Sequence, residues 1–196
     1  MCGGDGGALS HVRILAGRWK GRPLGVPDGA RPTSGRAREA LFSILRDSLS
    51  GARVLDLYAG SGALGLEALS RGASRVVFVE DRPAALDRSL ERIGASQAES
   101  EVLRGDVQEA LRTLLGREDR FDLVFSDPPY GSPSERLVPP DAAGLLTPGG
   151  LFILQVDRPA GPLPEPAGWS LVQRRDYRRN VFLFLTPVSS RFGVLF

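Results

Sequence analysis

Short apolar runs recur along this 196-residue chain, separated by polar or glycine-rich stretches. The clearest run, residues 121–126, has few polar breaks, which is typical of a buried strand. Apolar runs of similar length predict further strands over residues 53–57, 75–79, 101–104, 151–156, 169–173 and 181–185. Apolar residues at helical spacing predict helices over 37–49, 83–93 and 107–115, and another helix that ends near residue 71.

The order of these elements predicts the fold class. Strands that alternate with helices indicate an α/β protein with a doubly wound, Rossmann-like, mostly parallel sheet. The last two strands are joined by the short, Arg-rich link 174–180, so we expect an antiparallel C-terminal hairpin. Residues 145–150 are expected to form a turn before the strand at 151–156. Residues 12–16 and 22–27 are expected to form an N-terminal β-hairpin around a Gly-bounded turn.

The predicted helix at 37–49 is amphipathic. One face carries Ala37, Leu41, Ile44, Leu45 and Ser48. The residues expected mostly to face water are Arg38, Glu39, Arg46 and Asp47. Thr33 or Ser34 is expected to cap this helix. We expect a main domain at 51–187 after an extension at 12–50, with a disordered tail at 1–11 and a C-terminal tail at 188–196.

Composition excludes several classes of protein. Apolar residues make up 42% of the chain, enough for a sizeable core, yet no segment approaches 18 uninterrupted apolar residues. We therefore expect no membrane span, and a Gly-rich start without an apolar core predicts no secretory signal and a cytoplasmic location. Because Cys2 and His11 are the single residues of their kinds, we expect no metal site and no Ser–His catalysis.

The net charge of +2 is unevenly distributed. Residues 13–38 carry seven Lys and Arg against the single acid Asp28. Arginine binds phosphate in a bidentate way and stacks on bases, so this segment predicts a polyanionic partner. A solvated basic face is the alternative. Trp19 lies between basic residues, where it could stack on a base or pack in the core.

A glycine-rich loop follows the predicted strand at 53–57. Gly60, Gly62 and Gly65 match the dinucleotide fingerprint, and Glu80 lies 20 residues past Gly60. On that basis alone NAD is a legitimate ligand. The glycines could also serve only the packing of a helix on a strand.

Acidic residues at the ends of predicted strands favour a different ligand. Asp56 lies at the end of the first strand, where a carboxylate suits a cationic or amine-bearing ligand better than a pyrophosphate. Glu80 and Asp106 follow the next two strands, and ligands of open α/β sheets bind at this edge. S-adenosylmethionine has an ammonium, a sulfonium, a ribose and an adenine, but no phosphate. These acids therefore predict S-adenosylmethionine.

The turn Asp127-Pro128-Pro129-Tyr130 ends the strand at 121–126, because proline cannot continue a central strand. In doubly wound sheets this strand lies beside the first, so the turn opens next to the glycine loop. The turn resembles the (Asp/Asn)-Pro-Pro-(Tyr/Phe) signature of amino-group methyltransferases. The Asp127 side chain and the Pro128 carbonyl can accept the two N–H bonds of a planar amine. Tyr130 can stack on the base.

Further segments carry a more specific resemblance. Residues 16–24, 31–42 and 55–72, together with the Asp-Pro-Pro-Tyr turn, resemble the bacterial RsmD family. The resemblance implies a class I methyltransferase with a seven-stranded sheet and an N-terminal hairpin that helps to grip RNA. It implies methylation of the N2 amino group of a guanine in 16S rRNA, within an assembled or assembling 30S subunit. We expect a monomer.

The candidate site residues fall into three groups. The catalytic candidates are Asp127, Pro128, Pro129 and Tyr130. The cofactor-binding candidates are Asp56, Tyr58, Ala59, Gly60, Ser61, Gly62, Glu80, Asp81, Asp106 and Val107. The RNA-binding candidates are Arg13, Arg18, Lys20, Arg22, Arg31, Thr33, Arg36 and Arg38.

The chain departs from the family pattern at two places. Many relatives have a glycine in the turn where this chain has Tyr177-Arg178-Arg179-Asn180, and a helix where residues 131–140 are rich in proline. Both places lie on the substrate side. Other acceptors, a DNA base or a protein glutamine, remain open, as do an NAD-dependent oxidoreductase and a noncatalytic RNA-binding assembly factor.

Overall fold

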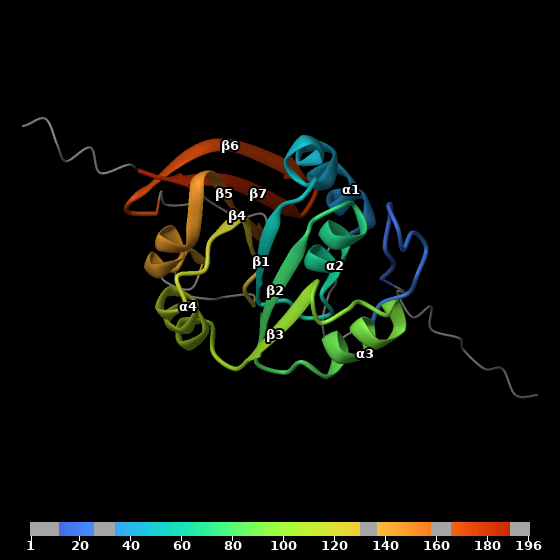
Figure 1. Ribbon diagram of the computed structural model, residues 1–196. Helices are drawn as coiled ribbons and strands as arrows, with labels where there is room; N and C mark the ends of the chain where they lie inside the picture. Colours follow the sequence, from blue (N-terminus) through green and yellow to red (C-terminus); the bar gives the residue numbers. More distant parts are fainter. Residues whose placement is uncertain (1–11, 26–33, 130–136, 158–165, 189–196) are drawn as a thin grey trace, which may run out of the picture.

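The computed structural model describes residues 12–25, 34–129, 137–157 and 166–188. These residues form one seven-stranded sheet with helices on both faces (Figure 1). The strand order is β3-β2-β1-β4-β5-β7-β6. The first five strands are parallel, and β7 runs antiparallel to both β5 and β6. The predicted doubly wound sheet and its antiparallel C-terminal hairpin are confirmed.

All the predicted strands of the sheet are present. Their bounds are β1 (Arg53–Leu57), β2 (Arg75–Glu80), β3 (Ser100–Arg104), β4 (Phe121–Ser126), β5 (Leu146–Asp157), β6 (Trp169–Tyr177) and β7 (Asn180–Pro187). The prediction of a turn over 145–150 is wrong, because Leu146 already pairs with Phe121 and a register shift absorbs the following residues. The predicted link 174–180 is also too long, because pairing continues to Tyr177 and Asn180.

The predicted helices are present, although α1 is shorter than predicted, and the 3₁₀ helix η2 was not predicted. The helical elements are α1 (Gly35–Ile44), η1 (Arg46–Ser48), α2 (Ala63–Ser70), α3 (Ala84–Ile93), α4 (Val107–Gly116) and η2 (Pro140–Leu145). Ser34 caps α1, since its Oγ accepts a 3.2 Å hydrogen bond from the Ala37 N–H. The α-helix ends at Ile44 instead of continuing to 49, and a 3₁₀ turn follows. Ile44 is exposed, whereas Leu45 is buried as expected.

The N-terminal segment, residues 12–25, contains less strand structure than predicted. Its two arms share one antiparallel bridge, between Arg13 and Pro23, instead of forming two strands. Backbone hydrogen bonds on either side of this bridge run from Ile14 N–H to the Arg22 carbonyl and from Leu24 N–H to the Val12 carbonyl. Trp19 is only 7% exposed and belongs to the core, so it packs inward and does not present its face to a base.

The core lies in two layers, one on each face of the sheet. Alternation along β1 divides its side chains, with Val54 in one layer and Leu55 and Leu57 in the other. The first layer lies under the N-terminal segment, α1, α2 and α3, and the second under α4 and η2. Figure 1 shows α1, α2 and α3 to the right of the sheet and α4 to its left.

Among the described residues, no helix is both long enough and apolar enough to cross a bilayer. Within the same ranges, His, Cys, Asp and Glu side chains form no group that could hold a metal ion.

Candidate active site

The parallel strands bring the predicted acids to one edge of the sheet. Leu57, the last residue of β1, pairs with Val79 on one side and Ser126 on the other. The glycine loop after β1 therefore lies between the residues that follow β2 and those that follow β4. This is the carboxyl edge of the sheet, where ligands of open α/β sheets bind.

The backbone N–H groups of the three fingerprint glycines have protein acceptors. Gly60 N–H donates to Glu80 Oε2 at 2.7 Å, and Gly62 N–H donates to the Ala59 carbonyl at 2.7 Å. Gly65 N–H donates to Asp56 Oδ2 at 2.8 Å. A dinucleotide fingerprint needs such amides for the pyrophosphate. Because these three N–H groups are already hydrogen-bonded within the protein, the loop favours a ligand without phosphate.

Gly65 serves packing rather than ligand binding. A Cβ at this position would lie 2.4 Å from Phe78 Cε1 and 2.8 Å from Val76 Cγ1. The missing side chain lets α2 lie directly on β2. Gly62 precedes α2 with a φ of +77°, a left-handed conformation that glycine adopts without strain.

Asp56 is an almost fully buried carboxyl group among other acids. Burial raises its pKa well above the ordinary value of 3.8, and the Asp127 and Glu80 carboxylates raise it further, against the hydrogen bond from Gly65. The strand register brings these groups to the same edge, since Leu57 pairs with Val79 and with Ser126, the residues before Glu80 and Asp127. Acids that raise one another's pKa create a negative potential, which attracts a cationic ligand.

Glu80 lies at the end of β2 and is half-buried. Its two oxygens accept N–H groups from Gly60, at 2.7 Å, and from Arg82, at 3.0 Å. Burial raises the pKa of Glu80, and a hydrogen bond shared with the exposed Asp81 raises it further. A carboxylate has about four acceptor positions, so Glu80 retains capacity for the hydroxyls of a ribose.

Asp106 is exposed and caps α4, where its Oδ1 accepts a 2.8 Å hydrogen bond from Gln108 N–H. The next residue, Val107, is buried. Tyr58 has a φ of +57°, a conformation uncommon for a residue with a side chain. Tyr58, Ala59 and Ser61 therefore belong to a tightly turned loop between β1 and α2.

A side chain on the neighbouring strand β5 is hydrogen-bonded to Asp127. Gln155 on β5 is 5% exposed, and its Nε2 donates to Asp127 Oδ2 at 3.1 Å. The register explains the contact, because Ser126 pairs with Leu154. We did not predict Gln155, although a polar residue inside the apolar run 151–156 was an available signal. Pro128 is half-buried and Pro129 exposed, and Tyr130 lies outside the described residues.

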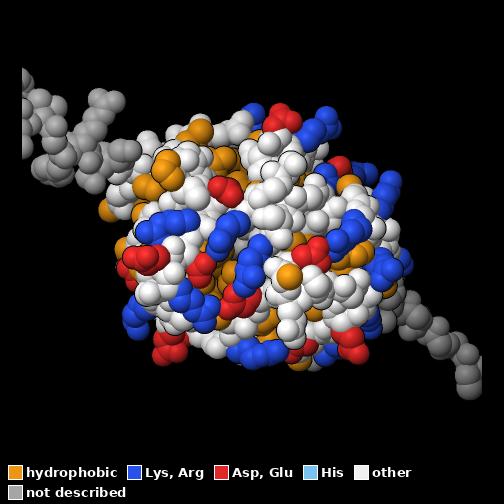
Figure 2. Space-filling model, in the orientation of Figure 1, with side chains coloured by type: hydrophobic (Ala, Val, Ile, Leu, Met, Phe, Trp, Pro, Cys, Tyr) orange, Lys and Arg blue, Asp and Glu red, His pale blue; other side chains and the backbone are white. Residues whose placement is uncertain are grey.

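Several predicted RNA-binding side chains have partners within the protein. Arg18 makes bonds of 2.9 and 3.1 Å to Glu99 and lies over the Trp19 ring. Arg22 donates to the Arg92 carbonyl at 2.9 Å, and Arg13 to the Gly21 carbonyl at 3.1 Å. Lys20 and Arg36 are exposed, and Arg31 and Thr33 lie outside the described residues. On the face drawn in Figure 2, basic and acidic side chains are interspersed.

The prediction that Arg38 faces water is wrong. This side chain is 2% exposed and donates to the Arg13 carbonyl at 2.8 Å and the Ala63 carbonyl at 3.4 Å. Burial lowers its pKa, which nearby Glu67 raises. Arg38 therefore ties α1 to the N-terminal segment and the start of α2, and its guanidinium is not presented to a phosphate.

Glu67 on α2 is a second buried charge that we did not predict. It accepts the N–H groups of Leu15 and Ala16 at 2.7 and 3.0 Å, and Arg71 Nε at 2.7 Å. The only signal in the sequence was an acid inside an apolar helix. Its carboxylate docks the N-terminal segment onto α2.

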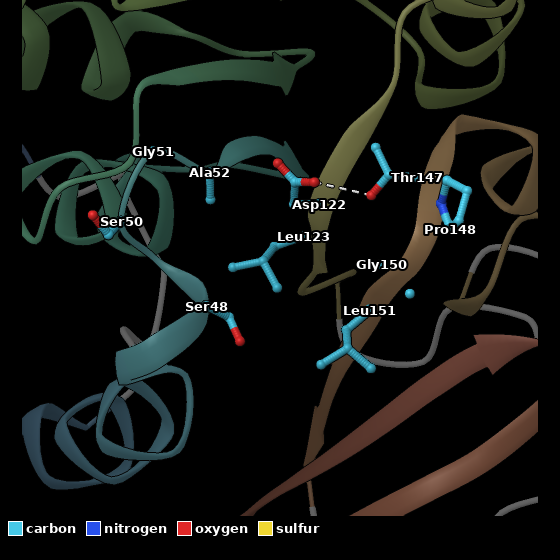
Figure 3. Close-up of a pocket in the computed structure, with 11 residues that line it drawn as sticks. Ser48, Ser50, Gly51, Ala52, Asp122, Leu123, Thr147, Pro148, Gly150 and Leu151 are labelled. Atoms are coloured by element: carbon cyan, nitrogen blue, oxygen red, sulfur yellow. Dashed lines mark hydrogen bonds between the residues drawn. The ribbon is translucent and has the colours of Figure 1, made fainter.

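A cavity of about 340 Å³ lies at the opposite edge of the sheet (Figure 3). It is lined by residues at the amino ends of β1, β4 and β5. Asp122 in this cavity already accepts Thr147 Oγ1 and Arg53 N–H, both at 2.9 Å. The predicted site residues are absent from its lining, so it is separate from the candidate active site.

Known proteins are similar to this chain in sequence and in fold. The chain is 34% identical over 175 residues to ribosomal RNA small subunit methyltransferase D of Haemophilus influenzae, covering 86% of this chain and 90% of that protein. It is 36% identical over 166 residues to the Escherichia coli K12 protein of the same name, covering 82% of each. A solved hypothetical protein of Thermus thermophilus superposes with a TM-score of 0.77 at 37% identity, covering 90% of this chain and 99% of that one.

The family-level comparison covers the same part of the chain. The model described as conserved hypothetical protein 95 matches residues 12–186, which include the N-terminal segment, the glycine loop and the Asp127 turn. This chain belongs to that family, the RsmD family, as the resemblance of its motifs predicted.

Proposed function

We propose that this chain transfers a methyl group from S-adenosylmethionine to the N2 amino group of a guanine in 16S rRNA. The observation that carries the proposal is the Asp127 carboxylate, which Gln155 holds beside the glycine loop. The relatives are named as small-subunit rRNA methyltransferases, which supports the substrate class. The choice of guanine N2 rests on the family resemblance and on an acid that can accept amine hydrogens.

The residues at the carboxyl edge fit this cofactor. When bound, S-adenosylmethionine supplies an electrophilic methyl group on a positively charged sulfur. The Asp56, Glu80 and Asp106 side chains are acceptors that suit ammonium, hydroxyl and amino groups. The glycine loop offers a close backbone approach, while its bonded glycine amides disfavour a phosphate.

On the acceptor side, Asp127 is the residue that orients the amine. The lone pair of a guanine amino group is delocalised into the ring. Asp127 and the Pro128 carbonyl would accept its two N–H bonds and turn the lone pair toward the methyl group. Such positioning can contribute on the order of 7–11 kcal/mol to catalysis. A stacked base must first be extruded, which costs a few kcal/mol. Tyr130 would then stack on its face.

The N-terminal part of the chain would serve RNA binding as an extension of the catalytic domain. Lys20 and Arg36 are its exposed candidates. Arg13, Arg18 and Arg22 would act mainly by shaping the segment, given their internal partners. We propose that the monomeric chain acts on the 30S subunit or its precursor in the cytoplasm.

Transfer of a tritiated methyl group tests the proposal. The purified chain is incubated with labelled S-adenosylmethionine and, separately, with 30S particles from a strain that lacks the homologue, naked 16S rRNA, or duplex DNA. We expect label in ribosomal RNA and N2-methylguanosine in its nucleoside digest. Label in DNA, or a different methylated nucleoside, would contradict the proposal.

A variant pair ties the activity to the site. Asp127→Ala should abolish transfer while calorimetric binding of S-adenosylmethionine changes little. Asp47→Ala, an exposed acid on η1, is the matched control and should retain full activity. Stabilisation of the chain against heat by NAD, with none by S-adenosylmethionine, would favour an oxidoreductase instead.

A further inference from the structure

The tip of the β6–β7 hairpin carries two adjacent exposed arginines, Arg178 and Arg179. Pairing of Tyr177 with Asn180 leaves these two as the whole turn. Among the described residues, neither guanidinium has an ion-pair partner. Their neighbour Arg174 differs, because it makes two 3.0 Å bonds to Asp176. Within the described part of the chain, the turn therefore presents two uncompensated positive charges.

The strand register places this turn at the edge that holds the candidate active site. Asn180 pairs with Asp157, the last residue of β5. Leu154 of β5 pairs with Ser126, which directly precedes Asp127. Asp157 is three residues farther along, so the turn stands roughly 10 Å beyond the end of β4, at about 3.3 Å per residue. It lies two strand spacings, roughly 10 Å, to the side of β4.

Aromatic side chains beside the turn pack against each other and against the core. Tyr177 and Phe182, which flank it, make an edge-to-face contact with ring centroids 5.9 Å apart. Phe182 is fully buried in the core. A rigid hairpin presents charges with less loss of conformational entropy on binding than a free loop.

The backbone at Arg178 has a φ of +50°, in the left-handed region. A residue with a Cβ occupies that region at a cost of roughly 1–2 kcal/mol, which glycine would avoid. The conformation of the turn therefore does not explain why residue 178 is an arginine. Burial does not explain it either, since the side chain is exposed.

We infer that Arg178 and Arg179 bind backbone phosphates of the ribosomal RNA on the β5–β7 side of Asp127. This rests on the proposed function for the identity of the RNA. The tip of the N-terminal segment is bonded elsewhere, by Arg18 N–H to Ser70 at the end of α2 and by Arg22 to Arg92 near the end of α3. Both helices run back from the carboxyl edge toward the start of the next strand, so this tip lies away from the Asp127 turn. Arginine suits this task because its planar guanidinium binds phosphate in a bidentate way.

The test compares Arg178→Ala/Arg179→Ala with wild type in direct binding to 30S particles and in methyl transfer. We expect affinity to fall about tenfold at about 0.1 M salt, with the salt slope of log K smaller by about 1.5 for two lost phosphate contacts. KM for the particle should rise while S-adenosylmethionine binding stays unchanged. The charge-matched control is Arg112→Ala/Arg120→Ala, at exposed positions on α4 and just before β4, and should show neither change.

A second variant separates binding from folding. Arg178→Gly relieves the left-handed strain, so it should keep or raise the melting temperature while still weakening particle binding. Unchanged particle affinity and salt slope in both variants would overturn the inference, as would an equal loss in the control. Because binding is measured apart from transfer, a wild-type chain that binds RNA but methylates none would count against the proposed function and leave this inference testable.

Discussion

Gln155 Nε2 donates a 3.1 Å hydrogen bond to Asp127 Oδ2, and this bond joins the middle of the sheet to the candidate catalytic acid. Gln155 is buried on β5, so its amide is fixed by the strand that bears it. A carboxylate has about four acceptor positions, so a substrate amine can bind Asp127 while this bond is kept. The orientation of Asp127 thus depends on a neighbour 28 residues away in the chain.

Replacing this amide should slow the methyl transfer without weakening the cofactor site. In Gln155→Leu the side-chain size is nearly kept but the donor is lost, so Asp127 can rotate away from the amine. We expect kcat to fall by about 10- to 100-fold, since small misplacements of a reacting group can cost that much. Single-turnover transfer and calorimetric cofactor binding measure the two effects. Gln97→Leu, at an exposed position, is the control, and equal losses in both variants would refute a positioning role.

Gly65 should tolerate no side chain. In Gly65→Ala the new Cβ would meet Phe78 and Val76 at 2.4 and 2.8 Å and push α2 from β2. We expect the free energy of unfolding to fall by about 1–3 kcal/mol, as for other overpacked cores. Gly116→Ala, at the end of α4 with nothing within 4 Å, should be neutral or stabilising by up to about 1 kcal/mol. Urea denaturation of both variants checks this. Equal stability of the two variants would contradict the packing role.

Glu67 should hold the N-terminal segment on α2. In Glu67→Gln an NH₂ group replaces one of the two carboxylate oxygens. Because both oxygens accept N–H groups in the wild type, this NH₂ donor would face another donor, either a backbone N–H or Arg71. We expect a loss of roughly 2–3 kcal/mol in the free energy of unfolding and faster proteolysis within residues 12–25. Glu39→Gln removes the other carboxylate that Arg71 binds, at the surface, and should cost under about 1 kcal/mol. Slow proteolysis of both variants would show that the carboxylate does not dock the segment.

Residues whose surroundings are local were predictable, and residues with distant partners were not. The strand at 121–126 and the glycine loop follow from apolar runs and from turn chemistry, which act over a few residues. Arg38 and Glu67 have acceptors and donors 25 and 52 residues away, so a charged side chain in a helix gave no sign of its burial. The early start of β5 depends on Phe121 as a pairing partner, which no local pattern reveals. The role of Gln155 likewise depends on a partner on another strand.

The buried Asp56 should make stability fall as pH rises. Burial, with Asp127 and Glu80 nearby, raises its pKa above the ordinary value of 3.8, so the folded chain keeps this proton at pH values where the unfolded chain has released it. The resulting stabilisation is complete below the ordinary pKa and is lost as pH rises through the folded-state pKa. Asp56→Asn cannot ionise and can still accept Gly65 N–H, so its stability relative to wild type should increase as pH rises above the ordinary pKa of 3.8. Urea unfolding of both proteins at a series of pH values above 3.8 measures the difference, in which titrating groups remote from Asp56 cancel. A difference that stays constant would mean that Asp56 titrates alike in both states.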